Sequence, residues 1–208
     1  IGGNGYTICS GSGDGAIRLW DIETTKQFNV FKGHTNYVNS VKYGPDGLVN
    51  TILSGSDESV RLWDIRSGQQ IQVFKEHTDY VYAVEYSPLI IKNSIGNSSV
   101  ICSGSWDNTI RFWDIRSNKN QLYIIKGDDE KDGGIFCLKF IVLKKKENTK
   151  NVAYDLNLCY DVFYFTLFFK KLKQLRSMIF KEFKSVITEN LFKYQNKLQG
   201  ISSAVFFV

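Results

Sequence analysis

The chain has 208 residues, of which 43 % are hydrophobic, 14 % aromatic and 23 % charged, with a formal net charge of +5. This balance is typical of a folded protein with a sizeable core and excludes a chain that is disordered throughout. No window holds about 18 consecutive apolar residues, so we expect no integral membrane segment. The single methionine is Met178 rather than residue 1, so we expect the sequence to be a fragment.

The charge is divided unevenly along the chain. Residues 1–140 contain 14 Lys+Arg against 16 Asp+Glu, whereas residues 141–208 contain 12 against 5. Sixteen of the 17 glycines, both prolines and all four tryptophans also precede residue 141. The basic average therefore describes neither part, and no nucleic-acid partner is expected from it.

Three segments of the first part repeat one pattern. Residues 9–23 read CSGSGDGAIRLWDIE, residues 53–66 read LSGSDESVRLWDIR and residues 102–116 read CSGSWDNTIRFWDIR. Their Trp-Asp pairs follow one another at spacings of 43 and 50 residues. A second block, FNVFKGHTNYVN at 28–39, matches IQVFKEHTDYVY at 71–82 without a gap. A fixed period of this length indicates a repeat architecture.

Each unit is predicted to form four short strands. In the second unit these cover about residues 37–43, 48–54, 59–65 and 70–74. The turn residues of Gly44-Pro45-Asp46-Gly47 and Ser67-Gly68 separate them. The strands carry apolar residues on both faces, so each sheet needs cover on two sides, which stacked copies would supply.

These residues resemble the WD-repeat β-propeller family and, within it, proteins like the G-protein β subunit. The resemblance implies an all-β fold, a partial β-propeller of four-stranded blades over residues 1–140. We expect repeats at about 1–31, 32–74 and 75–125 and a partial repeat at 126–140. It also implies an intracellular location, cytoplasmic or nuclear.

The family pattern further implies a buried, hydrogen-bonded tetrad of His, Ser, Asp and Trp in each repeat. By position, the tetrads are His34, Ser54, Asp57 and Trp63, then His77, Ser103, Asp107 and Trp113, and an incomplete set of Ser10, Asp14 and Trp20. The second copy has one residue fewer between Ser54 and Asp57, so its turn is expected to be tighter. Residues 89–99 lengthen one connection of the third copy.

Ser, His and Asp side chains in recurring order also suggest a hydrolase triad. The structural interpretation is favoured, because a nucleophile would be unique rather than repeated at a fixed distance from a tryptophan. Residues 11–16 fit a loose dinucleotide-binding pattern, but a strand rather than a helix is expected after them. The four cysteines show neither C-x-x-C pairing nor zinc-ligand spacing and are expected to be small buried residues. We therefore expect no catalytic residue, cofactor or metal.

Other proteins are the expected partners. In the family, contacts often come from residues flanking the first-strand valine and from residues around the turn aspartate. By position, the partner-binding candidates are Tyr37, Asn39, Ser56, Tyr80, Tyr82, Trp106 and Asn108. Large aromatic side chains are enriched in binding hot spots, so three of these are expected to form one contact surface on a single blade.

A second hypothesis concerns the arginines that follow two of the Trp-Asp pairs. Residues 101–116 resemble the sixteen-residue box of WD-repeat proteins that recruit substrates to cullin-RING ubiquitin ligases through an adaptor. Arg66 and Arg116 hold the distinguishing position, whereas the first copy has Glu23. The expected function is thus a non-catalytic scaffold for protein–protein interactions. The alternatives are a ligase substrate receptor and the regulatory repeat region of a larger enzyme.

Residues 141–208 are rich in Lys and Phe, and no repeat is expected there. At the third Gly-His position stands Gly127-Asp128, so the next blade should lack its histidine, and no Trp-Asp occurs near residues 156–163 where one is due. One hypothesis is that this part is a gene-model artefact, either translated intron or a frameshifted end. The other takes the apolar spacing from Phe168 to Leu198 as a basic amphipathic helix that binds a partner or a membrane surface. Disorder is the third expectation for this part.

Overall fold

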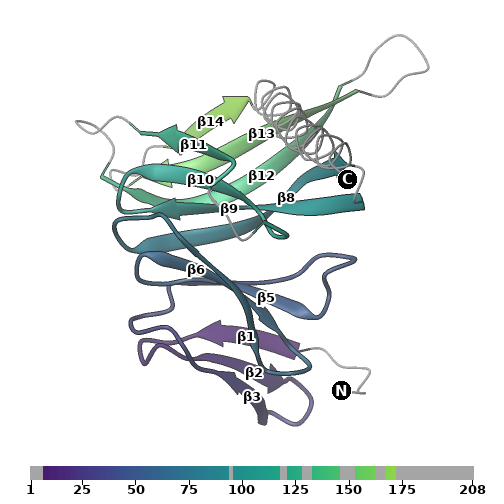
Figure 1. Cartoon of the computed structure of the whole chain (residues 1–208), viewed down its shortest axis with the longest axis vertical. Helices are drawn as coiled ribbons and strands as arrows, with labels where there is room; N and C mark the ends of the chain where they lie inside the picture. The colour runs from purple at the N-terminus through teal and green to yellow at the C-terminus, as the bar shows by residue number, and fades with distance from the viewer. Residues whose placement is uncertain are drawn as a thin grey trace, which may run out of the picture. The chain divides into compact units, whose positions relative to one another are not determined.

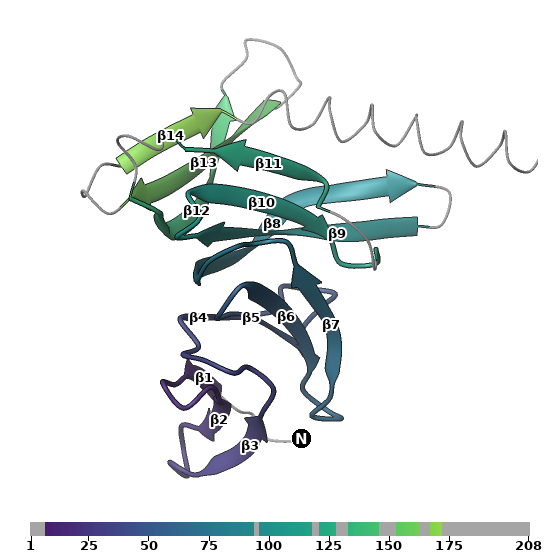
Figure 2. The ribbon, with the colours of Figure 1, turned by 60° about the vertical axis from the view of Figure 1, so that its left-hand side comes forward.

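The computed structural model describes residues 7–93, 96–117, 121–127, 133–145, 153–162 and 167–171. The chain divides into two units, Ile1–Lys171 and Leu172–Val208, and every described residue belongs to the first. Within the described ranges all regular elements are β-strands, which confirms the predicted all-β fold. Figures 1 and 2 show them as successive antiparallel sheets.

Four sheets follow one another in the described part of the chain, and we call them blades 1 to 4. Blade 1 contains β1 (Thr7–Gly11), β2 (Ile17–Asp21) and β3 (Gln27–Phe31), and blade 2 contains β4 (Ser40–Tyr43), β5 (Thr51–Gly55), β6 (Ser59–Asp64) and β7 (Gln70–Lys75). Blade 3 contains β8 (Val81–Asn93), β9 (Gly96–Ser105), β10 (Thr109–Asp114) and β11 (Tyr123–Lys126), and blade 4 contains β12 (Ile135–Lys145), β13 (Ala153–Val162) and β14 (Leu167–Lys171). In each blade, neighbours in sequence pair antiparallel, so each blade is a simple meander.

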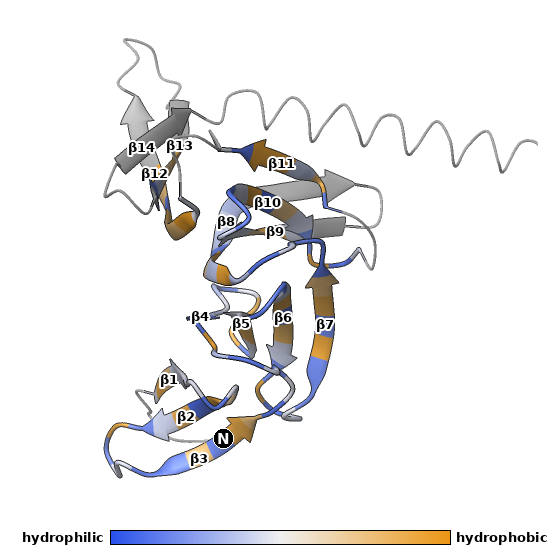
Figure 3. Cartoon of the chain, turned by 90° about the vertical axis from the view of Figure 1, so that its left-hand side faces the viewer, coloured by the Kyte–Doolittle hydropathy of each residue, from blue (hydrophilic) through white to orange (hydrophobic). Residues whose placement is uncertain are grey.

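Blade 2 shows why the strands are apolar on both faces. Ile52 and Trp63 pack with Ile17, Leu19 and Phe31 of blade 1. Their sequence neighbours point to the opposite face because side chains alternate along a strand. Each residue in these clusters has less than a tenth of its surface exposed. In Figure 3 the orange apolar bands accordingly lie along the strands, whereas the connections are largely blue.

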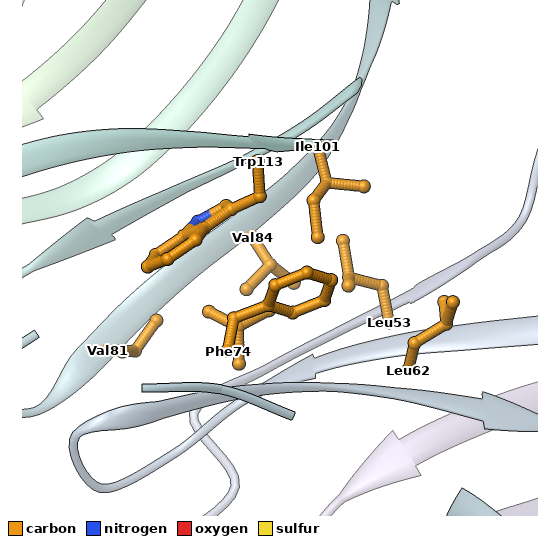
Figure 4. Packing of buried hydrophobic residues seen from close by; sticks show 8 residues of the cluster. Leu53, Leu62, Phe74, Val81, Val84, Ile101 and Trp113 are labelled. Carbon is orange, nitrogen blue, oxygen red and sulfur yellow. The ribbon is translucent and has the colours of Figure 1, made fainter. Parts of the chain in front are cut away.

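The opposite face of blade 2 packs on blade 3. Figure 4 shows this second cluster, in which Leu53, Leu62 and Phe74 of blade 2 meet Val81, Val84, Ile101 and Trp113 of blade 3. Burial of one large aliphatic or aromatic side chain stabilises a fold by about 1.5–3 kcal/mol. The two clusters therefore join three consecutive blades through shared side chains rather than through the backbone alone.

A glycine of the Ser-Gly-Ser motif sits at each blade junction. A Cβ atom on Gly11 would lie 2.7 Å from Val38 Cγ1, one on Gly55 2.7 Å from Val81 Cγ1, and one on Gly104 2.6 Å from Ile135 Cγ2. These distances are too short for any larger residue, so glycine is required where the first strand of the following blade passes. Ile135 thus occupies in blade 4 the place that a valine holds in blades 2 and 3.

Polar contacts across the junctions repeat as well. Tyr43 Oη donates to Thr7 Oγ1 at 3.0 Å, and Tyr86 Oη lies 3.0 Å from Thr51 Oγ1. Burial raises the pKa of Tyr86 to about 12. By register, Phe140 of blade 4 takes the place of these tyrosines. Val100 takes the place of the two threonines, so an apolar pair replaces the polar pair at this junction.

The inner strands also carry a row of charges at one equivalent position. Glu85 in β8 lies between Lys42 in β4 and Lys139 in β12, with Oε2–Nζ distances of 3.2 and 3.7 Å. The Glu85 side chain is only 13 % exposed, so its charge is compensated by lysines from the blades on both sides. Blade 4 therefore takes part in the same junction chemistry as blades 2 and 3.

Blade 4 extends beyond the boundary expected at residue 140. β12 runs to Lys145, and β13 and β14 follow it within the part for which no repeat was expected. The register pairs Lys139 with Cys159, as it pairs Glu85 with Cys102 in blade 3. The third-strand positions equivalent to Trp113 and Asp114 are Lys170 and Lys171, later than the expected 156–163.

The connection predicted to be long in the third copy is a continuation of the ladder. β8 and β9 remain paired from Ile90↔Ser99 to Asn93↔Gly96, beyond a register shift between Tyr86 and Ile90. In blade 2 the corresponding pairing already ends at Tyr43↔Ile52, where the turn containing Gly47 begins. Gly47 has a φ of 87°, which explains the need for glycine in this turn.

The predicted amphipathic helix begins within a described strand. Residues from Phe168 to Lys171 belong to β14, which corrects the helix expectation there. The rest of that pattern, up to Leu198, lies outside the described residues. Among the residues that are described, none belongs to a helix long and apolar enough to cross a membrane.

Candidate functional site

In blade 3 the structure brings the four predicted tetrad residues together. Trp113 Nε1 donates to Ser103 Oγ at 3.0 Å, and the same oxygen lies 2.7 Å from His77 Nε2. His77 Nδ1 lies 2.7 Å from Asp107 Oδ2. The carboxylate also accepts the Thr78 N–H at 3.1 Å and the Thr109 hydroxyl at 2.6 Å. These bonds tie the loop before β8 to β9 and β10.

The hydrogen bonds fix the direction of each donor in this tetrad. A carboxylate only accepts, so His77 Nδ1–H donates to Asp107, and the neutral ring then accepts the Ser103 hydroxyl at Nε2. Burial lowers the pKa of His77 and favours this neutral form. Burial alone would raise the pKa of Asp107, but the interactions with His77, Thr109 and Thr78 together outweigh burial and hold that pKa far below its usual range.

The tetrad of blade 2 has the same members but a looser aspartate contact. His34 Nε2 lies 2.7 Å from Ser54 Oγ, which also accepts Trp63 Nε1–H at 2.8 Å. The distance from His34 Nδ1 to Asp57 Oδ1 is 3.4 Å, and Asp57 is 28 % exposed against 5 % for Asp107. The shorter turn between Ser54 and Asp57 accounts for the difference. Burial lowers the pKa of His34 to about 4, and the positive charge of Arg61 acts in the same direction.

In blade 1 only the Ser–Trp part of the tetrad is present. Trp20 Nε1 donates to Ser10 Oγ at 2.9 Å, and Trp20 is half-buried, whereas Trp63 and Trp113 are each 2 % exposed. Asp14 accepts Arg18 Nη1–H at 3.1 Å and the Ala16 N–H at 3.1 Å. The Asp14 carboxylate therefore accepts hydrogen bonds from its own turn and from the strand that follows it.

A cluster of four aromatic side chains lies at the edge of blades 3 and 4 that carries the tetrad loops. Tyr82 is at its centre, with ring centroids 6.4 Å from Tyr80, 6.0 Å from Trp106 and 4.7 Å from Phe136. Trp106 also meets Phe136 edge-on at 5.4 Å. Tyr80 is 41 % and Trp106 39 % exposed, whereas Tyr82 and Phe136 are half-buried. We call Tyr80, Tyr82, Trp106 and Phe136 the rim patch.

Sequence reasoning singled out three members of the rim patch and missed Phe136. Phe136 directly follows Ile135, as Tyr82 follows Val81 and Asn39 follows Val38, so a residue flanking the first-strand apolar position was the signal. Gly134 has a φ of 96° and lies close to Trp106. A Cβ atom added to this glycine would be 2.9 Å from Trp106 Cα. Only a glycine there allows the tryptophan this close approach to blade 4.

The other candidates for partner contact are exposed outside the rim patch, as Tyr37 and Asn39 are, or buried, as Ser56 and Asn108 are. Tyr37 is 63 % exposed on blade 2, and the exposed Asn39 donates from Nδ2 to Val81 O at 3.2 Å. Ser56 is fully buried and donates to Asn36 O and Tyr37 O, and Asn108 is 7 % exposed at a φ of 59°. Ser56 and Asn108 therefore hold the loops in place and present little surface to a partner.

Arg66 and Arg116 lie at the opposite edge of blades 2 and 3, in the turns that follow β6 and β10. Both side chains are exposed. Arg116 Nε is 4.0 Å from Asp114 Oδ1, so the ion pair is long and leaves the guanidinium accessible. The two arginines thus repeat at one edge, separate from the rim patch.

The cysteines are less uniform than expected. Cys102 is buried, Cys9 and Cys159 are half-buried, and Cys137 is exposed, which corrects the expectation that all four are buried. Cys9, Cys102 and Cys159 occupy the same second-strand position in their blades. Within the described ranges, no group of three His, Cys, Asp or Glu side chains is placed to hold a metal ion.

Comparison with known families agrees with this geometry. The family described as WD40, the WD domain or G-beta repeat, matches residues 2–21, 25–64 and 68–114. The chain therefore belongs to the WD40-repeat family, whose repeats serve as protein-interaction scaffolds. Each matched repeat ends at a Trp-Asp pair, and the second and third begin with the last strand of the preceding blade, so the repeats are offset from the blades by one strand.

Three curated relatives are similar to parts of the chain. The guanine nucleotide-binding protein subunit beta of Oryza sativa subsp. indica is 31 % identical over 66 % of this chain and 37 % of its own length. The ribosome biogenesis protein YTM1 of Yarrowia lipolytica is 38 % identical over 26 % of this chain and 11 % of its own length. Autophagy-related protein 16 of Arabidopsis thaliana is 46 % identical over 26 % of this chain and 10 % of its own length. The chain thus spans well under half the length of these relatives.

Proposed function

We propose that this chain is a non-catalytic scaffold of a multiprotein complex and that the rim patch is its main contact with a partner protein. The observation that carries the proposal is the convergence of four aromatic rings from three chain segments, two of them about two-fifths exposed. Exposed clusters of large apolar side chains often mark binding sites, so the exposure of Trp106 within this aromatic cluster favours a binding role.

The physical basis is the energetics of aromatic burial at interfaces. Trp106 and Tyr80 offer large rigid surfaces whose burial costs little conformational entropy. Trp106 N–H donates to Tyr80 O at 2.9 Å, so the two exposed residues are held to one another through the backbone. A partner would therefore meet a surface that is already ordered, which lowers the cost of association.

Absence of catalysis is part of the proposal and is supported by the state of the serines. Ser54 and Ser103 are each fully buried, and each hydroxyl oxygen already accepts an indole N–H. A nucleophile needs access to substrate and a general base free to accept its proton. The Ser–His–Asp arrangement here instead connects the strands of one blade.

Replacing Trp106 by alanine tests the proposed contact. We expect the Trp106→Ala variant to lose about 2 kcal/mol of partner affinity, or roughly 30-fold in Kd, because one of the two exposed aromatic rings of the rim patch is removed. The measurement is titration of the partner captured by the wild-type chain. Phe28→Ala, at a 41 % exposed aromatic residue on β3, is the matched control and should bind normally. Full retention of affinity by Trp106→Ala would remove the rim patch as the contact.

One observation supports a second candidate, a substrate receptor for a cullin-RING ubiquitin ligase. Arg66 and Arg116 are both exposed at one edge, where a ligase adaptor would have access to them. Charge reversal by Arg66→Glu and Arg116→Glu is expected to abolish co-purification of that adaptor and to leave Trp106-dependent binding intact. Co-purification that survives both substitutions would exclude this role for the two arginines.

A further inference from the structure

We infer that the rim patch takes an arginine side chain from a basic segment of the partner, with Trp106 as the stacking surface and Asp79 as the counter-charge. The inference rests on the proposed function and specifies the chemistry of the partner. Three observations carry it: the fixed orientation of the indole, the acidic character of the surrounding loops, and the position of Asp79 beside the patch.

The indole of Trp106 is held in place by neighbours from two blades. Its backbone N–H is bonded to Tyr80 O, and Phe136 meets its ring edge-on at an interplanar angle of 88°. Gly134 lies against its Cα and its ring atom Cε3, at 2.9 and 3.2 Å from an added Cβ. Two-fifths of the side chain nevertheless remains exposed. A rigid, exposed indole is the aromatic side chain that attracts a cation most strongly.

The described loops at this edge carry an excess of acidic residues. The connections before β4 and β8 and the turns before β2, β6 and β10 contain Asp14, Asp57, Glu58, Glu76, Asp79 and Asp107, against Lys32 and the terminal lysines of the outer strands, Lys75 of β7 and Lys126 of β11. Asp14 and Asp107 are engaged with Arg18 and His77, whereas Glu58 and Glu76 are exposed. Arg18 and Arg111 balance Asp14 and Asp107, so the acidic part of this edge is the connection before β8, which holds Glu76 and Asp79 and no lysine or arginine and favours a positively charged ligand beside the rim patch.

Asp79 is the acid that belongs to the patch itself. Its Oδ1 accepts the Tyr80 N–H at 2.7 Å, and its backbone oxygen accepts the Ser105 hydroxyl at 3.0 Å. Ser105 directly precedes Trp106, so the loop of Asp79 and the loop of the indole are joined. The carboxylate is partly exposed and retains acceptor capacity at Oδ2, because a carboxylate accepts up to about four hydrogen bonds.

Arginine fits this combination better than lysine does. A guanidinium is planar, so it can stack on an indole while its edge donates two hydrogen bonds to a carboxylate. An ammonium is more strongly hydrated and offers no flat face for stacking. The expected ligand is thus an arginine within an otherwise basic segment, and a citrulline, which keeps the shape but not the charge, should bind poorly.

The test uses the full chain and three fluorescent peptides with Gly-Arg, Gly-Lys and Gly-citrulline repeats, followed by anisotropy. We expect the arginine peptide to bind about 5- to 30-fold more tightly than the citrulline peptide, and Trp106→Ala to lose a factor in the same range. Asp79→Asn keeps the bond to the Tyr80 N–H but removes the charge, and should weaken binding about 3-fold or more. Asp46→Asn, at an exposed turn on the opposite edge, and Phe28→Ala are the matched controls and should change nothing.

Equal binding of the arginine and lysine peptides, or an unchanged affinity in Trp106→Ala, would overturn the inference. Binding of the captured partner to the two variants then shows whether only the arginine chemistry or the rim-patch contact itself is wrong. If Trp106→Ala still loses the partner while Asp79→Asn keeps it in full, the rim patch is a contact of another chemistry. If both variants keep the partner, the proposed contact itself is wrong.

Discussion

The Trp113→Ala variant is expected to lower the free energy of unfolding by about 3–5 kcal/mol, a range typical of large aromatic-to-alanine changes in cores. Trp113 is 2 % exposed and packs against Phe74 of the preceding blade at a centroid distance of 5.4 Å. Its removal leaves a cavity between blades 2 and 3 and takes the indole donor from Ser103. Packing and hydrogen bonding are lost together at a junction that joins two sheets.

Denaturant unfolding followed by far-ultraviolet circular dichroism measures this loss, and Trp20→Ala is the matched control. Trp20 holds the same motif position and bonds to Ser10, but it is only half-buried. Its replacement should therefore cost clearly less, about half or below. Equal losses for the two variants would mean that burial at the junction of blades 2 and 3 does not determine stability.

His77→Ala is expected to cost about 1–3 kcal/mol, because it leaves the buried Asp107 and Ser103 without their shared partner. A double-mutant cycle with Asp107→Ala should show strong coupling, since the two residues form one network. The equivalent cycle of His34 with Asp57 should show weaker coupling because that contact is 3.4 Å rather than 2.7 Å. Additive losses in the blade 3 cycle would contradict the hydrogen-bonded tetrad.

The same histidines predict a pH dependence of stability. Their pKa values are lowered by burial, His34 to about 4, from an unfolded value of about 6.5. The unfolded chain then binds more protons than the folded one between these values, so stability is full above pH 6.5 and falls as the pH is lowered towards 4. The slope contributed by His34 approaches about 1.4 kcal/mol per pH unit, and His77 adds to it in the same direction. His77→Ala should reduce this slope, and a slope unchanged by that substitution would contradict the assignment.

The fold of blades 1 to 3 was predictable because their constraints are local and repeated. Apolar residues at successive positions specify strands with two buried faces, and Gly47 and Gly68 mark turns at φ of 87° and 71°. The predicted strands of blade 2 differ from β4 to β7 by no more than a few residues at their ends. The resemblance to WD repeats likewise implied a tetrad with Ser54, Asp57 and Trp63, whose contacts with His34 or with one another are seen in blade 2.

Blade 4 was not predictable from the motif because its motif residues are absent. Tyr160 and Lys170 stand at the register positions of the tetrad serine and tryptophan, yet the backbone ladder forms between strands rich in β-branched and aromatic residues. The evidence for this blade lies in contacts with blade 3 instead, namely Ile135 against Gly104 and Lys139 near Glu85. Pairwise matches of this kind become visible only once the sheets are in register.

The candidate site shows the same division between local pattern and long-range contact. Tyr80, Tyr82 and Trp106 were predicted from their positions in one repeat, whereas Phe136 joins them from blade 4. Ser56, a predicted contact, is buried because its copy lacks the residue that Trp106 provides in the next. Ser56 is therefore equivalent to Ser105 of blade 3, because each serine donates its hydroxyl hydrogen to a backbone oxygen of the preceding loop.

Site-specific photocrosslinking tests the central claim most directly. A benzoylphenylalanine in place of Tyr80 in the rim patch should give a covalent adduct with the partner, because this residue is 41 % exposed and lies beside Trp106. The same probe in place of Phe28 on β3 or Arg116 on the opposite edge should give none with that partner. An adduct formed from position 116 or 28 but not from position 80 would contradict a scaffold that binds through its rim patch.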